Sequence, residues 1–416
     1  MNTKLRWSAA LAALAAVTGL FTAPPAQAKP EACPTLKKSD GWHGDNRARL
    51  QELIDAHCRA KGAEPVAVFD WDNTVIKNDV GDATMFWLLR NSRIRPPEKD
   101  DWRTTSRHLT DEAADALAGA CPTGVRTLPT ATDMRCADEI LSVYAQGVTT
   151  TGQKAFAGFD HRRMEPQYAW LAQLLRGWTT RQVASFAAAA RTENLAAPVG
   201  AEQRVGTGTV TGWVRYYDQQ RDLVRTLQRA GFDVWIVSAS PEPVVDVWAQ
   251  GVGIEPSHAL GIRNTTEHGR LTARLKGCGS VPDAEDSMIT YIDGKRCWIN
   301  QEIFGVRGRA AEQVQPAHLR QVFAAGDSDT DVTFLHDATG LRLVLNRNKN
   351  ELMCRAYDNS DGRWLVNPMF IEPRKRKTSP YPCATTAYTA ADGTPQPVRR
   401  SDGSVVPDQW DSVFGS

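Results

Sequence analysis

The 416-residue sequence has almost no net charge, with 49 basic and 48 acidic residues and a formal charge of +1. This balance gives no general reason to expect nucleic acid or an anionic membrane as a partner. Internal repeats are lacking. Hydrophobic residues make up 42% of the chain, which excludes intrinsic disorder. The length predicts two or three domains, and any specificity must come from a local site.

Zinc and dinucleotide motifs are lacking as well. None of the eight cysteines forms a C-x-x-C pair, and no histidine lies at zinc-finger spacing. The glycines of Val205–Gly212 miss the dinucleotide fingerprint by one position. An even number of cysteines is typical of disulfides in an oxidising compartment. Pairing of sequence neighbours predicts Cys33–Cys58, Cys121–Cys136, Cys278–Cys297 and Cys354–Cys383, although eight cysteines allow many other connectivities.

The sequence has no hydrophobic run long enough to cross a bilayer. The apolar stretch Ser8–Phe21 follows the basic residues Lys4 and Arg6, and it is shorter than the roughly 20 residues that a membrane span needs. Pro24–Ala28 supplies small residues typical of a cleavage site. We therefore expect residues 1–28 to be a cleavable signal peptide and the protein to be secreted, with no membrane anchor.

In the remaining chain, short apolar strands alternate with amphipathic helices, which predicts an α/β fold with a mostly parallel sheet. The expected strands are 64–70, 232–237, 258–263, 270–274, 321–325 and 341–345. We expect the core to comprise residues 29–89 and 215–354. An inserted helical cap is expected at 90–214, with helices at 110–120, 138–146, 165–178 and 180–191. Residues 355–416, rich in Pro, Gly, Ser and Asp, predict a C-terminal extension, either an ordered surface wrap or a tail.

Polar side chains follow the ends of three predicted strands: Asp70 and Asp72, then Ser238, then Asp327 and Asp331. Because ligands of open α/β sheets bind beyond the carboxyl ends of the strands, we expect these side chains to lie together. Alternation in extended backbone directs Asp70 and Asp72 to the same side. Crowded carboxylates repel one another unless a cation neutralises them, and oxygen ligands favour Mg²⁺.

Such an arrangement favours phosphoryl transfer. An ionised carboxylate can attack phosphorus and form an aspartyl-phosphate. A second carboxylate two residues further on can protonate the leaving alcohol and then activate water. The cation and a lysine would offset the charge of the phosphoryl oxygens. A single Asp after a strand is more often a loop cap, but three such signals in order favour a site.

Four segments resemble the four motifs of haloacid-dehalogenase-superfamily phosphatases: Val66–Thr74, Ile236–Ser238, Gly294–Lys295 and Gly326–Asp331. Their spacing is most similar to the phosphoserine-phosphatase-like branch. The resemblance implies a Rossmann-like core with an inserted helical cap, a Mg²⁺ cofactor and a small phosphate monoester as substrate. The second Asp of the first motif implies phosphatase rather than dehalogenase chemistry.

By this resemblance, Asp70 would be the nucleophile and Asp72 the general acid and base. The implied metal ligands are Asp70, Asp72 through its backbone carbonyl, and Asp327, with Asp331 in support. The implied phosphate-binding residues are Asn73, Ser238 and Lys295. Lys276, just after the strand expected at 270–274, is an alternative to Lys295.

The signal peptide, the large cap, Asp-x-Asp-Asn-Thr and Ser-Ala-Ser are together similar to secreted bacterial phosphorylcholine phosphatases. A quaternary ammonium group requires an aromatic or acidic pocket. Asp79, Asp82, Phe86 and Trp87 are candidates, although aromatic side chains on such a helix more often belong to the core. A phosphotransferase and a non-catalytic ligand-binding protein remain alternative functions, and the sequence does not determine the oligomeric state.

Overall fold

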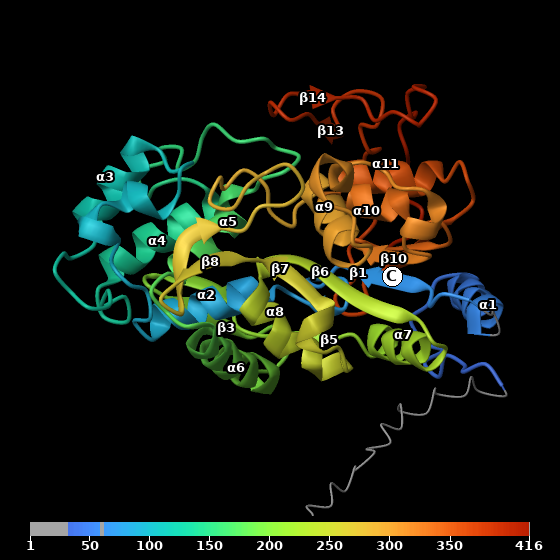
Figure 1. Ribbon diagram of the computed structural model, residues 1–416, viewed down its shortest axis with the longest axis horizontal. Coiled ribbons are helices and arrows are strands. Elements are labelled where there is room, and N and C mark those ends of the chain that lie inside the picture. The colour runs from blue at the N-terminus through green and yellow to red at the C-terminus, as the bar shows by residue number, and fades with distance from the viewer. Residues whose placement is uncertain (1–31, 59–61, 416) are drawn as a thin grey trace, which may run out of the picture.

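The computed structural model describes residues 32–58 and 62–415, so the predicted signal peptide lies outside the described residues. A six-stranded parallel sheet forms the centre of the molecule, in the order β12-β11-β10-β1-β6-β7 (Figure 1). Its strands are β1 (Val66–Phe69), β6 (Asp233–Pro241), β7 (Ala259–Ile262), β10 (Phe323–Gly326), β11 (Arg342–Asn346) and β12 (Trp364–Pro368). The predicted α/β fold with a mostly parallel sheet is confirmed.

Helices cover both faces of this sheet (Figure 1). One face packs against α1 (Asn46–Cys58), α7 (Asp218–Arg229) and α8 (Glu242–Ala249), and the other against α9 (Asp293–Glu302), α10 (Val332–Asp337) and α11 (Asn350–Asp358). Because side chains alternate along a strand, Ala67 and Phe69 of β1 join the first core while Val68 joins the second. Both faces of β1 are therefore buried, as expected for a short apolar run.

The chain leaves the sheet between β2 (Ile76–Lys77) and β5 (Arg215–Tyr216), which pair with each other antiparallel. None of the described residues in between contributes a strand to the six-stranded sheet. They form α2 (Val80–Arg90), α3 (Asp111–Ala120), α4 (Met134–Gln146), α5 (Pro166–Leu174), α6 (Thr180–Ala196), β3 (Glu202–Val205) and β4 (Gly208–Thr211). The four helices expected within 90–214 are present, and the glycine-rich segment at 205–212 contributes to the hairpin of β3 and β4.

Local side-chain contacts explain where these helices begin. The Thr110 hydroxyl accepts a hydrogen bond from the backbone N–H of Ala113, and Thr179 forms a capping box with Gln182.

A second hairpin, β8 (Asn264–Glu267) and β9 (Arg270–Leu275), follows β7 and turns away from the sheet toward α5. Short 3₁₀ segments are η1 (Glu98–Asp100), η2 (Trp102–Thr105), η3 (Gln250–Val252), η4 (Pro256–His258), η5 (Gly308–Glu312), η6 (Ala317–Leu319) and η7 (Asp329–Asp331).

The sheet extends beyond residue 354, where we expected the core to end. The edge strand β12 pairs in parallel with β11 along its whole length. The following residues cover α9–α11 and include the hairpin of β13 (Tyr388–Thr389) and β14 (Pro395–Gln396) (Figure 1). Tyr381, Cys383 and Val398 are buried in the same core as these helices. The extension is therefore an ordered surface wrap and not a tail.

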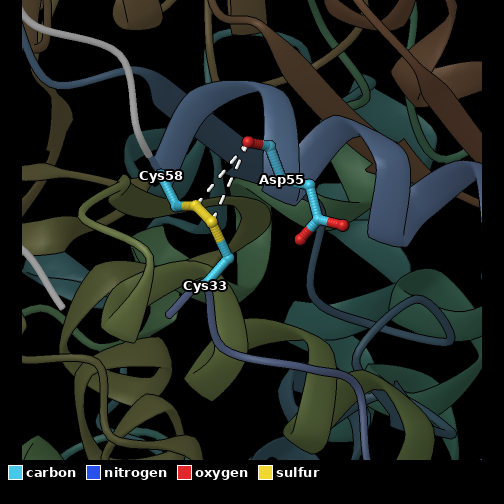
Figure 2. A group of neighbouring side chains, drawn as sticks. All are labelled: Cys33, Asp55 and Cys58. Carbon is cyan, nitrogen blue, oxygen red and sulfur yellow. Dashed lines mark hydrogen bonds between the residues drawn. A yellow bond between two sulfur atoms is a disulfide. The ribbon is translucent and has the colours of Figure 1, made fainter. Parts of the chain in front are cut away.

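Four disulfides link neighbouring cysteines, and the predicted pairing is confirmed. The sulfur atoms of Cys33 and Cys58 lie near Asp55, a group whose spacing would suit a metal ion (Figure 2). Because the two sulfurs are joined to each other, they are not available as thiolate ligands. Within the described ranges, no helix is both long and apolar enough to span a bilayer.

Candidate active site

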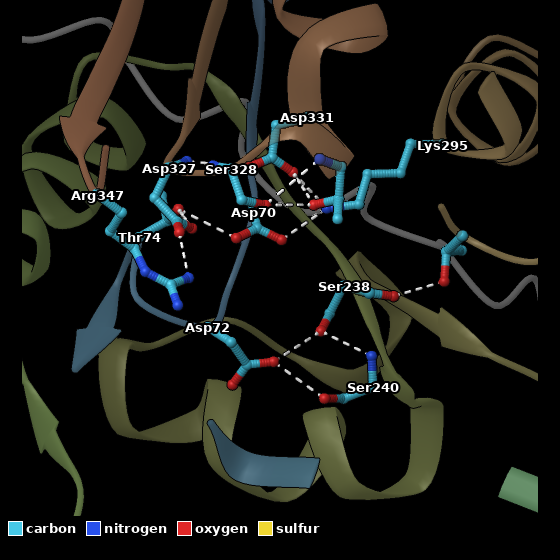
Figure 3. A network of polar contacts seen from close by, with 12 residues as sticks. Asp70, Asp72, Thr74, Ser238, Ser240, Lys295, Asp327, Ser328, Asp331 and Arg347 are labelled. Atoms are coloured by element: carbon cyan, nitrogen blue, oxygen red, sulfur yellow. Dashed lines mark hydrogen bonds and ion pairs between the residues drawn. The ribbon is translucent and has the colours of Figure 1, made fainter. Parts of the chain in front are cut away.

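The candidate site lies at the carboxyl end of β1. On one side of this strand the chain adds β6 and β7, and on the other side it adds β10, β11 and β12. Asp70 directly follows β1, and its backbone N–H donates to the carbonyl of Ala325 on β10 at 2.9 Å. Its Oδ1 accepts a hydrogen bond from Lys295 Nζ at 2.6 Å, and its Oδ2 lies 3.0 Å from the Thr74 hydroxyl oxygen (Figure 3). The backbone and both carboxylate oxygens of Asp70 are thus held in place.

Two further carboxylates join Asp70 from the end of β10 (Figure 3). Carboxylate oxygens of Asp70, Asp327 and Asp331 lie within 4.8 Å of one another, and all three residues are buried. Asp331 Oδ2 accepts the backbone N–H groups of Asp327 and Ser328 at 2.9 and 3.0 Å, which closes the turn after β10. The predicted convergence of carboxylates from separate strands is present for these three residues.

Lys295, rather than Lys276, lies in this cluster. It is fully buried, and its ammonium group is 2.6 Å from Oδ1 of both Asp70 and Asp331. Burial alone would lower the pKa of Lys295, but the two carboxylates outweigh it and raise this pKa, so the side chain stays charged. Lys276 is half exposed and forms an ion pair with Asp283.

The cluster suits a hard divalent cation. Burial and the carboxylate of Asp331 raise the pKa of Asp70, although Lys295 opposes them. A divalent cation, in addition to the ammonium group of Lys295, would offset the repulsion between the three carboxylates. Their oxygen atoms are the ligands that Mg²⁺ prefers. The residues that would hold the ion are Asp70, Asp327 and Asp331.

The side chain of Asp72 lies apart from this cluster and bonds to the end of β6 (Figure 3). Its Oδ2 accepts the hydroxyls of Ser240 at 2.9 Å and Ser238 at 3.3 Å, and its Oδ1 accepts the backbone N–H of Val80 at 2.8 Å. Burial, together with the carboxylates of Asp79 and Asp70, raises the pKa of Asp72. A carboxyl group that retains its proton is suited to act as a general acid.

A cavity of about 490 Å³ lies between this edge of the sheet and the inserted helices. Asp70, Asp72 and Asn73 line it from the first motif. Residues of α2, α4 and α5 line the opposite side and include Asp82, Phe86, Tyr144 and Tyr168. The size and the mixed polar and aromatic lining are typical of a site for a small molecule.

Two of the predicted phosphate-binding residues, Ser238 and Asn73, differ in their access to the cavity. Ser238 is fully buried and does not line the cavity, whereas Ser240, two residues further along β6, does. Asn73 lines the cavity with a left-handed backbone (φ 64°), and its side-chain oxygen accepts the N–H of Asn78 at 3.1 Å. Trp87 is not part of the lining: it stacks on Phe186 and donates to Glu193.

Three contributors were not identified as site residues from the sequence: Thr74, Ser240 and Arg347. The Thr74 hydroxyl lies 2.7 Å from Asp327 Oδ1 and so connects the first and last motifs. The Ser-x-Ser alternation at the end of β6 is a signal that could have indicated Ser240. Arg347, which follows β11, forms an ion pair with Asp327 at 2.6 Å, and no motif contains it.

Comparisons with known proteins agree with this geometry. Residues 148–336 match the family model of haloacid dehalogenase-like hydrolases, a range that begins after Asp70 and Asp72. A search of curated proteins finds no match. A functionally unknown protein from Anaerococcus prevotii DSM 20548 is 21% identical over 80% of this chain and 93% of its own, with a TM-score of 0.56, and therefore shares the fold.

Two further solved structures are less similar. A protein of unknown function from Bordetella pertussis Tohama I is 17% identical over 74% of this chain and all of its own, with a TM-score of 0.45. A substrate-bound phosphoserine phosphatase is 12% identical over 68% of this chain and 87% of its own, with a TM-score of 0.30. From the family match and the parallel sheet, we conclude that residues 148–336 are part of a haloacid dehalogenase-like hydrolase domain.

Proposed function

We propose that the protein is a secreted, Mg²⁺-dependent phosphatase that hydrolyses a small phosphate monoester through an aspartyl-phosphate. The observation that carries this proposal is the arrangement of Asp70 and Asp72 on the wall of one cavity. Asp70 is held by Lys295 beside two other carboxylates, while Asp72 lies apart from them, bonded to serine hydroxyls, with its pKa raised by burial and by the nearby carboxylates. One residue thus has the surroundings of a nucleophile and the other those of an acid.

In the first step, a carboxylate oxygen of Asp70 forms a bond to phosphorus while the ester P–O bond breaks. The leaving alkoxide takes the proton of Asp72. In the second step, Asp72 accepts a proton from water as the water oxygen attacks phosphorus, and the aspartyl P–O bond breaks. Inorganic phosphate leaves, and Asp70 and Asp72 return to their starting states.

Lys295 orients Asp70 and contributes positive charge beside the reacting phosphoryl group. Asp70, Asp327 and Asp331 would hold the divalent ion, which when bound stabilises negative charge on the phosphoryl oxygens. The backbone carbonyl of Asp72 remains a predicted ligand from the family resemblance. On the cavity wall, the side-chain amide nitrogen of Asn73 would donate to the substrate phosphate, whereas the Ser240 hydroxyl donates to Asp72.

Metal removal and substitution of the nucleophile test this function. Hydrolysis of p-nitrophenyl phosphate should stop in EDTA and return with Mg²⁺. Asp70→Asn should abolish turnover while leaving the unfolding temperature close to that of the wild type, because Asn retains the shape of the side chain. Asp283→Asn, which alters an exposed acid paired with Lys276, is the matched control and should remain active. Near-normal activity of Asp70→Asn would contradict the assignment of the nucleophile.

We further propose that the leaving alcohol carries a cationic group, as in phosphorylcholine. Asp79, Asp82, Phe86, Tyr144 and Tyr168 line the cavity on the side of α2, α4 and α5. The Tyr144 hydroxyl donates to Asp82 Oδ1 at 2.7 Å, and Tyr168 is 39% exposed. Aromatic faces beside carboxylates are favourable surroundings for a quaternary ammonium group.

A panel of phosphate monoesters tests this substrate class. Phosphorylcholine and other esters with cationic alcohols should have higher kcat/KM values than neutral esters of similar size. The same panel with and without an added acceptor alcohol distinguishes hydrolysis from phosphotransfer, because both reactions share the covalent intermediate. Hydrolysis of neutral monoesters without turnover of phosphorylcholine would exclude the cationic substrate and leave the phosphatase proposal standing.

The proposed secretion is supported by the four disulfides, which are typical of proteins that fold in an oxidising compartment. Expression of the full-length chain in a bacterial host tests it. N-terminal sequencing of the exported protein should begin at or near Lys29.

A further inference from the structure

Arg347 is a charged residue of the cavity that belongs to none of the sequence motifs. It follows β11, and its guanidinium donates to Asp327 Oδ2 at 2.6 Å (Figure 3). The side chain is 24% exposed and lines the cavity together with Asp70 and Asp72. Among the described residues, Asp327 is its one ion-pair partner within 4.0 Å.

Both carboxylate oxygens of Asp327 are engaged. Oδ2 accepts from Arg347, and Oδ1 accepts from the Thr74 hydroxyl at 2.7 Å. A divalent cation that takes Asp327 as a ligand must therefore share or replace one of these contacts. The Thr74 hydroxyl also lies 3.0 Å from Asp70 Oδ2 and is held inside the cluster, whereas Arg347 reaches Asp327 from the cavity. The guanidinium is thus the partner with space to move.

We propose that Arg347 competes with the divalent cation for Asp327, and that it binds the phosphoryl oxygens of the substrate when the cation holds Asp327. The inference rests on the proposed phosphatase function and assigns a further phosphate-binding residue to that site. A guanidinium presents several N–H donors in a planar fork and suits phosphate as well as carboxylate. Because Arg347 lines the same cavity as Asp70, its guanidinium needs only to exchange the Asp327 carboxylate for the phosphoryl group of the substrate.

The first test is the affinity for Mg²⁺ in the absence of any phosphate compound. Arg347→Gln should bind Mg²⁺ about tenfold more tightly in isothermal titration calorimetry, because a cation in contact with a ligand oxygen has been removed. Arg374→Gln is the matched control. Arg374 is an exposed arginine of the same cavity with no described ion-pair partner, and its loss should change the Mg²⁺ affinity less than about twofold.

The second test is the affinity of the Mg²⁺-saturated protein for inorganic phosphate. Arg347→Gln should weaken phosphate binding about tenfold or more, since a charge-assisted hydrogen bond is lost. Arg347→Lys keeps the charge without the fork. It should bind Mg²⁺ about as the wild type does, yet bind phosphate more weakly. If Arg347→Gln does not fold, Arg347→Lys still tests the predicted loss of phosphate affinity.

Equal Mg²⁺ affinities of Arg347→Gln and the wild type would overturn the proposal, as would an equal gain in Arg374→Gln. Unchanged phosphate affinity in both Arg347 variants would also overturn it. Neither binding measurement requires turnover. Failure of the phosphatase proposal would appear separately, as a lack of hydrolysis across the monoester panel.

Discussion

The ammonium group of Lys295 lies 2.6 Å from a carboxylate oxygen of Asp70, and neither side chain is appreciably exposed to solvent. A second contact of 2.6 Å connects Lys295 to Asp331. A buried charge is tolerated only when it is paired and hydrogen-bonded. Lys295 therefore has a structural role in addition to its proposed catalytic one, because it offsets the charge of two carboxylates that have little access to water.

Replacement of Lys295 should affect both stability and activity. Lys295→Met leaves Asp70 and Asp331 without their cation, and we expect a loss of about 3–5 kcal/mol in the free energy of unfolding. Lys276→Met removes an exposed lysine whose ion pair should contribute less than about 1 kcal/mol. Urea denaturation measured in EDTA, so that added cation does not compensate, compares the two variants. Similar stability losses would contradict the assignment of Lys295 to the buried cluster.

Substitution of Asp72 should separate the two chemical steps. With p-nitrophenyl phosphate, the leaving phenolate needs no proton, so Asp72→Asn should still form the aspartyl-phosphate. Without a base to activate water, we expect a burst of p-nitrophenol about equal to the enzyme concentration, followed by little turnover. The size of this burst is measured from the absorbance of p-nitrophenol after rapid mixing. An alkyl phosphate should give no burst, and steady turnover of both esters would exclude Asp72 as the acid and base.

Preference for a cationic substrate should depend on pH through Asp82. Burial and the neighbouring Asp79 raise the pKa of Asp82 to about 7. The carboxyl therefore loses its proton as the pH rises from 6 to 8, and the ionised form attracts a cation. We expect the kcat/KM of phosphorylcholine, divided by that of p-nitrophenyl phosphate, to increase by up to about tenfold over this range.

Both substrates carry a phosphate group that ionises, and dividing one kcat/KM value by the other cancels the effect of this shared ionisation. Asp82→Asn cannot ionise at this position and should give a lower ratio that is independent of pH. A wild-type ratio that stays flat, or that falls as the pH rises, would argue against Asp82 as part of the cation-binding wall.

The disulfide between Cys354 and Cys383 should stabilise the attachment of the C-terminal extension to α11. The two residues are 29 positions apart, and both are fully buried. Replacement of both by Ala should lower the free energy of unfolding by about 2–4 kcal/mol. The corresponding change at Cys121 and Cys136, which are 15 residues apart, should cost less. Guanidinium denaturation measures the free energy of unfolding of both variants. An unchanged value for the variant of Cys354 and Cys383 would contradict the stabilising role of this disulfide.

The local sequence was sufficient for features that depend on neighbouring residues. Apolar runs predicted the strands that end before Asp70 and Asp327, and Thr110 correctly indicated the start of α3. The pairing of sequence-adjacent cysteines was also correct. In each case, hydrophobic periodicity, capping or a short loop determines the result, and these properties can be read within a few turns of chain.

The sequence did not predict contacts between segments that are distant along the chain. Arg347 contacts Asp327 only because β11 pairs with β10, and Tyr144 meets Asp82 only because α4 and α2 both pack against α5 in the insertion. The C-terminal boundary of the core was missed because the position of β12 depends on its register with β11. The motifs by themselves indicated that Asp70, Asp327 and Asp331 converge at the carboxyl edge of the sheet, but not that the side chain of Asp72 lies apart from them. Tertiary packing alone brought Arg347 to Asp327 and the rings of Tyr144 and Tyr168 to the cavity, because these contacts depend on strand pairing and on how the insertion packs against the sheet.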